Sequence, residues 1–74
     1  MKLQGREIKI NMRGEDVARL HQALQSLGFR ISEPEVRQRR FGKATRAAVL
    51  EFQRGQGLES TGVVDGQSAR AIHA

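Results

Sequence analysis

Two amphipathic segments of this sequence end in the same way, with a glycine followed by a large apolar residue. The first has an apolar stripe at intervals of three and four residues: Val17, Leu20, Leu24 and Leu27. Such spacing places these side chains on one face of an α-helix. Gly28 can adopt the left-handed conformation that ends a helix, and Phe29 can fold back onto its last turn. We therefore predict a helix over residues 15–27.

The second segment follows Gly42, its expected N-cap, and has the same organisation. We predict that its inner face is formed by Ala44 or Ala48, Val49 and Phe52. A second stripe is predicted to be mostly exposed: Lys43, Arg46, Leu50 and Arg54. Gly55 and Gly57 end this helix, and Leu58 packs beneath it.

The remaining segments are shorter and less regular. Near the C-terminus, residues 61–62 indicate a turn and residues 63–64 are predicted to be core, while Asp65 is a suitable N-cap for a third, short helix. Near the N-terminus, apolar and polar residues alternate over 8–12, which indicates an extended segment. Residues 30–40 are polar, and we predict a loop in which Pro34 permits one helical turn.

The chain has 74 residues and no cysteine, so we expect one domain over residues 1–74, stabilised by helix packing and capped turns. The predicted fold is all-α: a small three-helix bundle with a short extended N-terminal segment. The formal net charge of +5 favours an anionic partner, although a charge of this size also serves solubility. No apolar run could span a bilayer, and the first residues do not form a secretory signal.

No group of residues typical of catalysis is present. His21 and His73 belong to no zinc, phosphate-binding or nucleophile motif, and we expect His21 to be exposed or half-buried on its helix. We therefore expect no enzyme activity, no cofactor and no metal. The interval between Gly28 and Gly42 is too long for the turn of a helix-turn-helix, which argues against nucleic acid.

The three aromatic residues, Phe29, Phe41 and Phe52, occupy packing positions, and the chain has neither Trp nor Tyr to stack on sugars. We therefore expect recognition through hydrogen bonds and charge. Gln53 is predicted to be a buried amide that holds loop backbone groups, with ligand contact as the alternative.

Three stretches, in this order, resemble the peptidoglycan-binding-like domain family, a small three-helix module: RGEDVARLHQALQSLGF, RFGKATRAAVLEFQRGQGL and TGVVDGQSARAI. The resemblance covers about residues 13–72. It includes Gly14, Val17, Leu20, Leu27, Gly28, Phe29, Phe41, Gly42, Thr45, Ala48, Val49, Phe52, Gln53, Gly57, Leu58 and residues 62–65. Two features depart from the family pattern: His21 replaces a glutamine, and Arg39-Arg40 replaces an Asp-Gly pair within a rewritten, charged loop.

The resemblance implies a non-catalytic module that anchors a larger exported protein to peptidoglycan or a related anionic polymer of the cell envelope. The expected location is extracellular or in the envelope, with a cytoplasmic location left open. The rewritten loop favours a second hypothesis, a protein-interaction or spacer module within a multidomain secreted or toxin-like bacterial protein. We expect a monomer that does not enter membranes, with a neighbouring catalytic or toxin domain.

The predicted ligand-binding surface comprises the arginine-bearing loop and the start of the second helix: Arg37, Arg39, Arg40, Phe41, Gly42, Lys43 and Arg46. Guanidinium groups bind carboxylates and phosphates in paired geometry, and peptidoglycan stem peptides and teichoic acids carry such groups. The alternative is a solvated loop whose arginines pair with Glu33 and Glu35.

Overall fold

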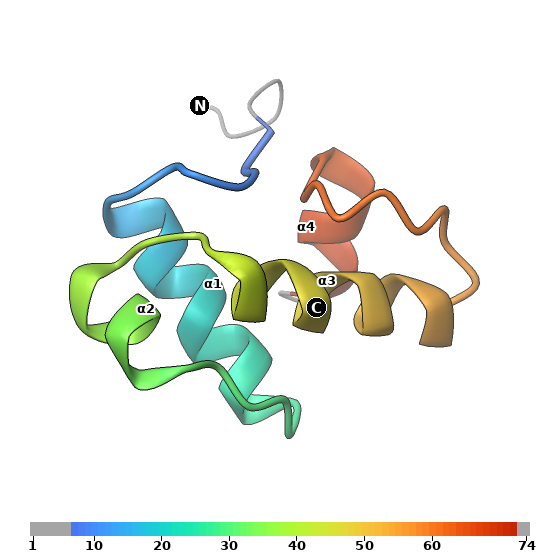
Figure 1. Cartoon of the computed structure of the whole chain (residues 1–74). Coiled ribbons are helices and arrows are strands. Elements are labelled where there is room, and N and C mark those ends of the chain that lie inside the picture. The colour runs from blue at the N-terminus through green and yellow to red at the C-terminus, as the bar shows by residue number, and fades with distance from the viewer. Residues whose placement is uncertain (1–6, 73–74) are drawn as a thin grey trace.

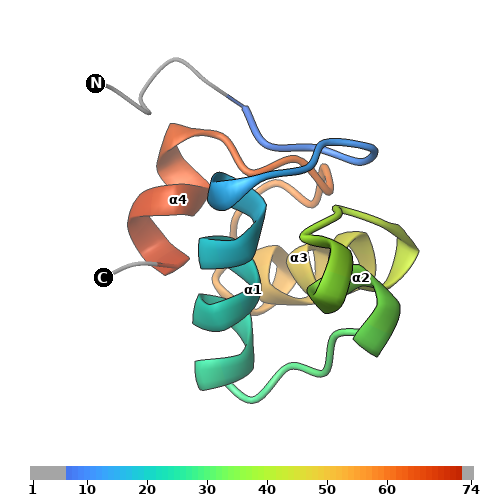
Figure 2. The same cartoon turned by 90° about the vertical axis from the view of Figure 1, so that its left-hand side faces the viewer.

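The computed structural model describes residues 7–72, and the secondary structure within them is helical apart from two isolated β-bridges. The elements follow in the order α1 Glu15–Ser26, α2 Glu33–Gln38, α3 Lys43–Gly55 and α4 Gly66–Ile72. Helix α1 packs against both α3 and α4, while α2 lies on the linker between α1 and α3 (Figures 1 and 2). The all-α prediction is confirmed, and the helical turn permitted after Pro34 is the complete short helix α2.

The core is formed by the inner faces of α1, α3 and α4, together with apolar residues from the segments between them. Its buried members are Ile8, Val17, Leu20, Leu24, Ile31, Phe41, Ala48, Val49, Phe52, Val64 and Ile72. Two predicted core positions are wrong. Leu27 is 50% exposed because it is the C-cap of α1 and lies beyond the last helical turn. Val63 is only partly buried, unlike its neighbour Val64.

Helices α1 and α3 end in the same hydrogen-bonded motif, as their shared sequence pattern predicts. The glycine that follows each C-cap is left-handed, at Gly28 (φ 95°) and Gly57 (φ 75°). The next amide donates to the carbonyl five residues earlier: Phe29 to Leu24 at 3.0 Å and Leu58 to Gln53 at 2.8 Å. This six-to-one bond defines a Schellman motif, which reverses the chain and returns an apolar residue to the helix.

The N-terminal segment crosses the molecule and joins two loops that are distant in sequence (Figure 2). Ile8 forms an antiparallel bridge with Val64, and Arg13 forms one with Arg40. Asn11, with φ 77°, lies in a turn between these bridges, so the predicted extended segment is interrupted. The segment thereby connects the loop before α4 with the linker that follows α2.

Gln53 holds the segment before α4, as its predicted structural role requires. It is 1% exposed, and its Oε1 accepts hydrogen bonds from the amides of Thr61 and Gly62, both at 3.0 Å. Its Nε2 donates to the Val63 carbonyl at 2.9 Å and to the Ser68 hydroxyl at 3.0 Å. One side chain of α3 therefore satisfies four polar groups of the following segment. The predicted N-cap of α4 is also confirmed, since the Ser68 amide donates to Asp65 Oδ1 at 2.8 Å.

None of the helices in residues 7–72 combines the length and the apolar character needed to cross a membrane. His73 lies outside the described residues.

Candidate functional site

The start of α3 is held by a carboxylate from another helix. Glu35 of α2 accepts hydrogen bonds from the amides of Gly42 (3.1 Å), Ala44 (2.9 Å) and Thr45 (2.9 Å). The Thr45 hydroxyl also donates to it, at 2.6 Å. The first amides of a helix have no partner within the helix, and a negative charge there is favoured by the helix dipole. Glu35 therefore serves as the cap that Gly42, which has no side chain, cannot provide.

The local backbone explains why Glu35 can reach α3. Pro34 occupies the first turn of α2, where its missing amide hydrogen costs nothing, and Arg39 ends this helix in the left-handed conformation at φ 53°. The chain reverses after Arg39 and brings Gly42 beneath the Glu35 side chain. A Cβ atom on Gly42 would lie 2.6 Å from Glu35 Cδ, so the close approach requires glycine at this position.

The environment of Glu35 keeps it ionised. Burial alone would raise the pKa of its carboxyl group, but the hydrogen bonds from the Thr45 hydroxyl and the three amides outweigh burial and lower the pKa to about 2. The predicted alternative, in which Glu35 pairs with the loop arginines, is wrong for this residue because its two oxygens are occupied at α3. Sequence reasoning missed this role because the carboxylate and its partners are seven to ten residues apart.

His21 extends this hydrogen-bonded group into α1. The ring is 1% exposed, which contradicts the expected exposed or half-buried position. Its Nε2 lies 2.8 Å from Thr45 Oγ1. The Thr45 hydroxyl donates its hydrogen to Glu35, so Nε2 must carry a hydrogen and donate to Thr45. Nδ1 is buried without a hydrogen-bond partner.

The pKa of His21 is lowered because burial disfavours the charged ring, although the Glu35 charge and the Arg40 backbone act in the opposite direction. The neutral ring therefore links α1 to the start of α3. This contact was not predictable, because His21 and Thr45 are separated by 24 residues in the sequence.

Helix α2 and its C-cap carry two of the predicted ligand-binding arginines. Arg37 is 3.9 Å from Glu33, and both side chains are at least 74% exposed, so this ion pair is weak. Arg39 is exposed and lines a hollow of about 250 Å³ between α1 and α2, together with Glu15 and His21.

Arg40 is bridged to a second basic residue that the sequence did not suggest. Arg13 lies directly opposite it in an antiparallel bridge, and both residues are exposed. The amide of Gly14 donates to the Arg39 carbonyl and the amide of Phe41 donates to the Met12 carbonyl, so the pair has no hydrogen bonds between its own backbones. Side chains are closest in such pairs, and like charges there repel. Neither guanidinium has a carboxylate partner within residues 7–72.

The other four predicted residues divide into two exposed cations and two buried positions. Lys43 and Arg46 are exposed on the first turns of α3. The Arg46 side chain lies against Gly62, and a Cβ atom on Gly62 would be 3.0 Å from Arg46 Nε. Phe41 is completely buried and Gly42 is buried beneath Glu35. Phe41 and Gly42 therefore anchor the arginine-bearing linker to the interior, whereas the side chains of Lys43 and Arg46 are exposed to solvent.

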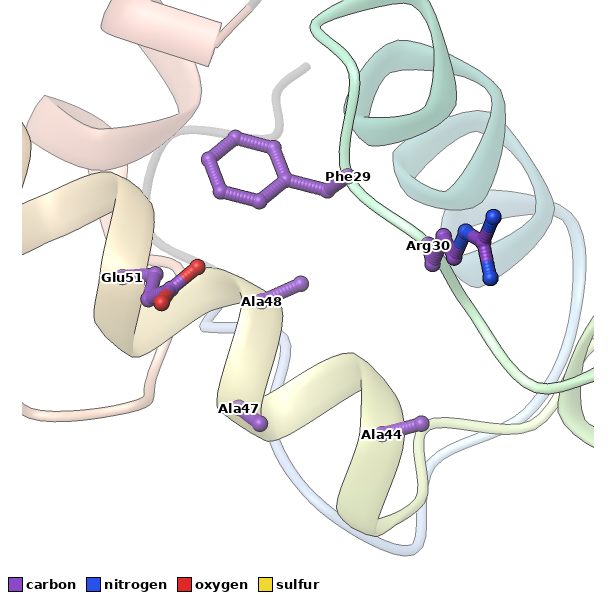
Figure 3. Close-up of a pocket in the computed structure, with 6 residues that line it drawn as sticks. All are labelled: Phe29, Arg30, Ala44, Ala47, Ala48 and Glu51. Carbon is purple, nitrogen blue, oxygen red and sulfur yellow. The ribbon is translucent and has the colours of Figure 1, made fainter.

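A groove lies beside this surface, between α3 and the linker after α1 (Figure 3). Its volume is about 370 Å³, and its lining comprises Phe29, Arg30, Ala44, Ala47, Ala48 and Glu51. The α3 residues recur at intervals of three, one and three, so they share one face of the helix. Residues 7–72 contain no group of His, Cys, Asp or Glu side chains that could hold a metal ion.

Comparison with known proteins agrees with this architecture. Residues 13–72 match the family described as "Putative peptidoglycan binding domain". The chain belongs to this family. The family is defined by a binding domain, and the match spans α1 to α4 as well as the Arg13–Arg40 bridge.

Two solved structures are similar to this family member over most of its length. A peptidoglycan-binding protein from Clostridioides difficile, in complex with glutamine hydroxamate, is 24% identical with a TM-score of 0.82, over 90% of this chain and 40% of that one. The endolysin of Burkholderia phage AP3 is 29% identical with a TM-score of 0.83, over 93% of this chain and 25% of that one. This chain thus spans less than half the length of either. No curated protein matches it.

Proposed function

We propose that this domain binds peptidoglycan or a related anionic polymer of the cell envelope without catalysing a reaction, and that it anchors a larger protein there. Membership of the peptidoglycan binding domain family supports the ligand class. The similarity to one quarter of a phage endolysin supports a module attached to a catalytic neighbour. An extracellular or envelope location follows from this ligand.

The observation that carries the proposal is the opposed pair Arg13 and Arg40. Two exposed arginines lie opposite each other in a backbone bridge, while Glu35, a carboxylate of the same region, is committed to the start of α3. A bound carboxylate or phosphate would relieve the repulsion between them and accept hydrogen bonds from both. Arg39 and Lys43, also exposed, lie on either side of Arg40 in the sequence.

The test is co-sedimentation with insoluble peptidoglycan, prepared with and without its covalently attached anionic polymers. The double variant Arg13→Gln/Arg40→Gln should bind about tenfold more weakly at low salt, because two charge-assisted contacts are lost. The matched control Arg54→Gln/Arg70→Gln removes two exposed arginines elsewhere and should retain most of the binding. Folding of the first variant should be unimpaired, since it removes a repulsive pair.

Failure of the unaltered domain to sediment with either preparation at low salt would remove the proposal. The domain would then fit the second hypothesis, a protein-interaction or spacer module. Equal loss in both double variants would also contradict the assigned site, because it would show that only total charge matters. If the unaltered domain sediments with the preparation that retains the anionic polymers but not with the preparation that lacks them, those polymers are the ligand.

A further inference from the structure

The positive charge of this chain is concentrated in two short stretches. Residues 8–13 and 39–46 contain no acidic residue and six basic residues, which we call the basic cluster: Lys9, Arg13, Arg39, Arg40, Lys43 and Arg46. The rest of residues 7–72 contains five basic and eight acidic residues. A charge that served only solubility would be interspersed with the opposite sign over the whole surface.

The fold brings the two stretches of the basic cluster together. The Asn11 amide donates to the Phe41 carbonyl, and the Phe41 amide donates to the Met12 carbonyl, both at 2.8 Å. The next residues on either side, Arg13 and Arg40, form the antiparallel bridge. The N-terminal segment thus runs beside the linker before α3 as well as beside the segment before α4 (Figure 2).

The Arg46 side chain extends the basic cluster toward the segment before α4. Its Nε and Cγ lie within about 3 Å of the place that a Cβ atom on Gly62 would take, so the side chain runs over that glycine. Gly62 precedes Val64 by two residues, Val64 is bridged to Ile8, and Lys9 follows Ile8. The basic cluster therefore extends from one bridge of the N-terminal segment to the other.

The charges of the basic cluster are not neutralised within the domain. All six residues are exposed, and among the residues that the structure describes none of the six forms an ion pair with a carboxylate. A single small anion would neutralise only one or two of these charges. A linear polymer with one negative charge in every repeat would neutralise several at once and release the counterions held along its length. The basic cluster therefore favours a polyanion.

The bridged arginines favour phosphodiesters over carboxylates as the charged groups of that polymer. The Cα atoms of such a bridged pair lie about 4.5 Å apart, and the two side chains leave the backbone on the same side. The two oxygens of a carboxylate lie in one plane and match the fork of a single guanidinium group. The free oxygens of a tetrahedral phosphodiester diverge, so each can accept hydrogen bonds from a different arginine.

The aromatic residues argue against nucleic acid as the source of the phosphodiesters. Proteins that bind single-stranded nucleic acid combine a basic surface with aromatic side chains on which the bases stack. Phe41 and Phe52 are buried and Phe29 is half-buried in the groove on the other side of α3, so the basic cluster has no stacking surface. A polymer without bases matches it better.

We infer that the basic cluster binds a linear polyol phosphate, a polymer in which phosphodiesters join short polyols. Arg13 and Arg40 together hold one phosphate, and the other four basic residues hold its neighbours along the polymer. This inference rests on the proposed function and narrows its ligand from an anionic envelope polymer to this one chemical class.

The experiment is a fluorescence anisotropy titration of a labelled synthetic oligomer of about ten glycerol phosphate repeats. Lys9→Gln/Arg13→Gln/Lys43→Gln should weaken binding about thirtyfold, since each exposed charge contributes about threefold. The matched control Arg30→Gln/Arg54→Gln/Arg70→Gln has the same net charge and should bind within about twofold of the unaltered chain. Equal urea midpoints for the two variants check that both are folded.

The salt dependence makes the test specific to direct phosphate contacts. A plot of the logarithm of the binding constant against that of the salt concentration should become shallower by about 2 in the first triple variant. Each lost contact contributes about 0.7, the value for single-stranded nucleic acids. The slope should not change in the control. Equal weakening by the two triple variants would overturn the inference, because net charge alone would then decide binding.

Other polymers of the same charge test the chemical class. A glutamate oligomer should bind several-fold more weakly than the glycerol phosphate oligomer, and a thymidine oligonucleotide should bind no more tightly than it. Equal binding of the glutamate oligomer would overturn the preference for phosphodiesters. Tighter binding of the oligonucleotide would overturn the assignment to a polymer without bases.

The outcomes also separate this inference from the proposed function. Sedimentation with peptidoglycan stripped of its anionic polymers, together with no binding of the glycerol phosphate oligomer at about 1 mM, would overturn the inference and leave the anchoring function intact. Absence of both sedimentation and oligomer binding would remove both proposals.

Discussion

The two ends of α3 are each organised by one polar side chain, and the two side chains differ in kind. At the C-terminal end, the neutral amide of Gln53 satisfies both donors and acceptors in the segment before α4. At the N-terminal end, the carboxylate of Glu35 receives only donors. An amide suits a loop with mixed polarity, whereas a helix start presents only N–H groups and favours an anion.

The difference also decides how each end responds to its surroundings. Gln53 does not titrate, so the loop that it holds should be insensitive to pH. Glu35 can be neutralised, and the same helix start carries the exposed Lys43 and follows Arg40. The region with the proposed ligand contacts is therefore built on an ionisable group, and the opposite region is not.

The largest effect is expected at the buried amide. Gln53→Met keeps the approximate volume but leaves the buried amide of Gly62 without a partner. It also removes one of the two hydrogen bonds of the Thr61 amide and of the Val63 carbonyl. The unsatisfied Gly62 amide and the other lost hydrogen bonds should together lower the free energy of unfolding by about 3 kcal/mol, which a urea titration measures. Gln67→Met, at an exposed position of α4, is the control and should change stability by less than about 0.5 kcal/mol. Equal midpoints for the two variants would contradict the role of Gln53.

The second effect concerns the carboxylate. Glu35→Gln retains an oxygen acceptor but removes the negative charge and turns an NH₂ group toward backbone donors. At pH 7 it should lower the free energy of unfolding by about 2 kcal/mol. Glu33→Gln removes an exposed carboxylate of the same helix, whose ion pair with Arg37 is long at 3.9 Å, and should cost a few tenths of a kcal/mol at most. A similar loss in both variants would indicate a general charge effect rather than capping.

The third prediction separates the two ends by pH. The folded-state pKa of Glu35 is about 2, below the ordinary value of 4.5, so its stabilisation is complete above about pH 5 and disappears as the pH falls toward 2. Roughly 2 kcal/mol of stability should be lost over this range after allowance for partial exposure. The difference between the unaltered chain and Glu35→Gln should therefore shrink with acidification, whereas the cost of Gln53→Met should stay constant.

His21 contributes to acid sensitivity in the same direction, because its pKa is lower in the folded state and protonation of the ring therefore favours unfolding. Because the Glu35 charge acts on the pKa of His21, the difference between the two proteins of the pH comparison reports on this coupled pair. A pH-independent difference would show that the carboxylate is not the ionised cap of α3. Thermal unfolding monitored by circular dichroism at several pH values provides the measurement.

The smallest effects are expected from two glycines at the Gln53 end of α3. Gly57 is left-handed at φ 75°, so Gly57→Ala should cost about 1 kcal/mol. Gly55 is the last residue of α3 and has free space around its Cα, so Gly55→Ala should be neutral or stabilise the protein by up to about 0.5 kcal/mol. Opposite signs in the shift of the melting temperature would confirm that the second glycine, and not the first, reverses the chain.

The features that sequence analysis predicted are those with local signals. The apolar stripes and left-handed glycines located α1 and α3, and the Asp65 cap located α4. Gln53 was also recognised, because a glutamine next to Phe52 on the core face must find partners for its amide. Each of these signals lies within a few residues of the feature that it predicts.

The features that were missed depend on contacts between distant segments. Glu35 in a polar stretch has the appearance of a solvated residue until the turn at Arg39 returns the chain to it. His21 is buried because Thr45 accepts its hydrogen bond from another helix. Arg13 joins the candidate site only through the register of its bridge with Arg40, which no pattern in the sequence encodes.

Gly42 has a consequence for any attempt to redesign this domain. Its missing side chain is the space that the Glu35 carboxylate occupies, since a Cβ there would lie 2.6 Å from Cδ. The residues at positions 35 and 42 therefore depend on each other. An alanine at position 42 would displace the carboxylate from the start of α3, and a shorter residue at position 35 would leave the first amides of α3 without an acceptor. Grafts of the α2 linker into another scaffold must therefore transfer both positions together.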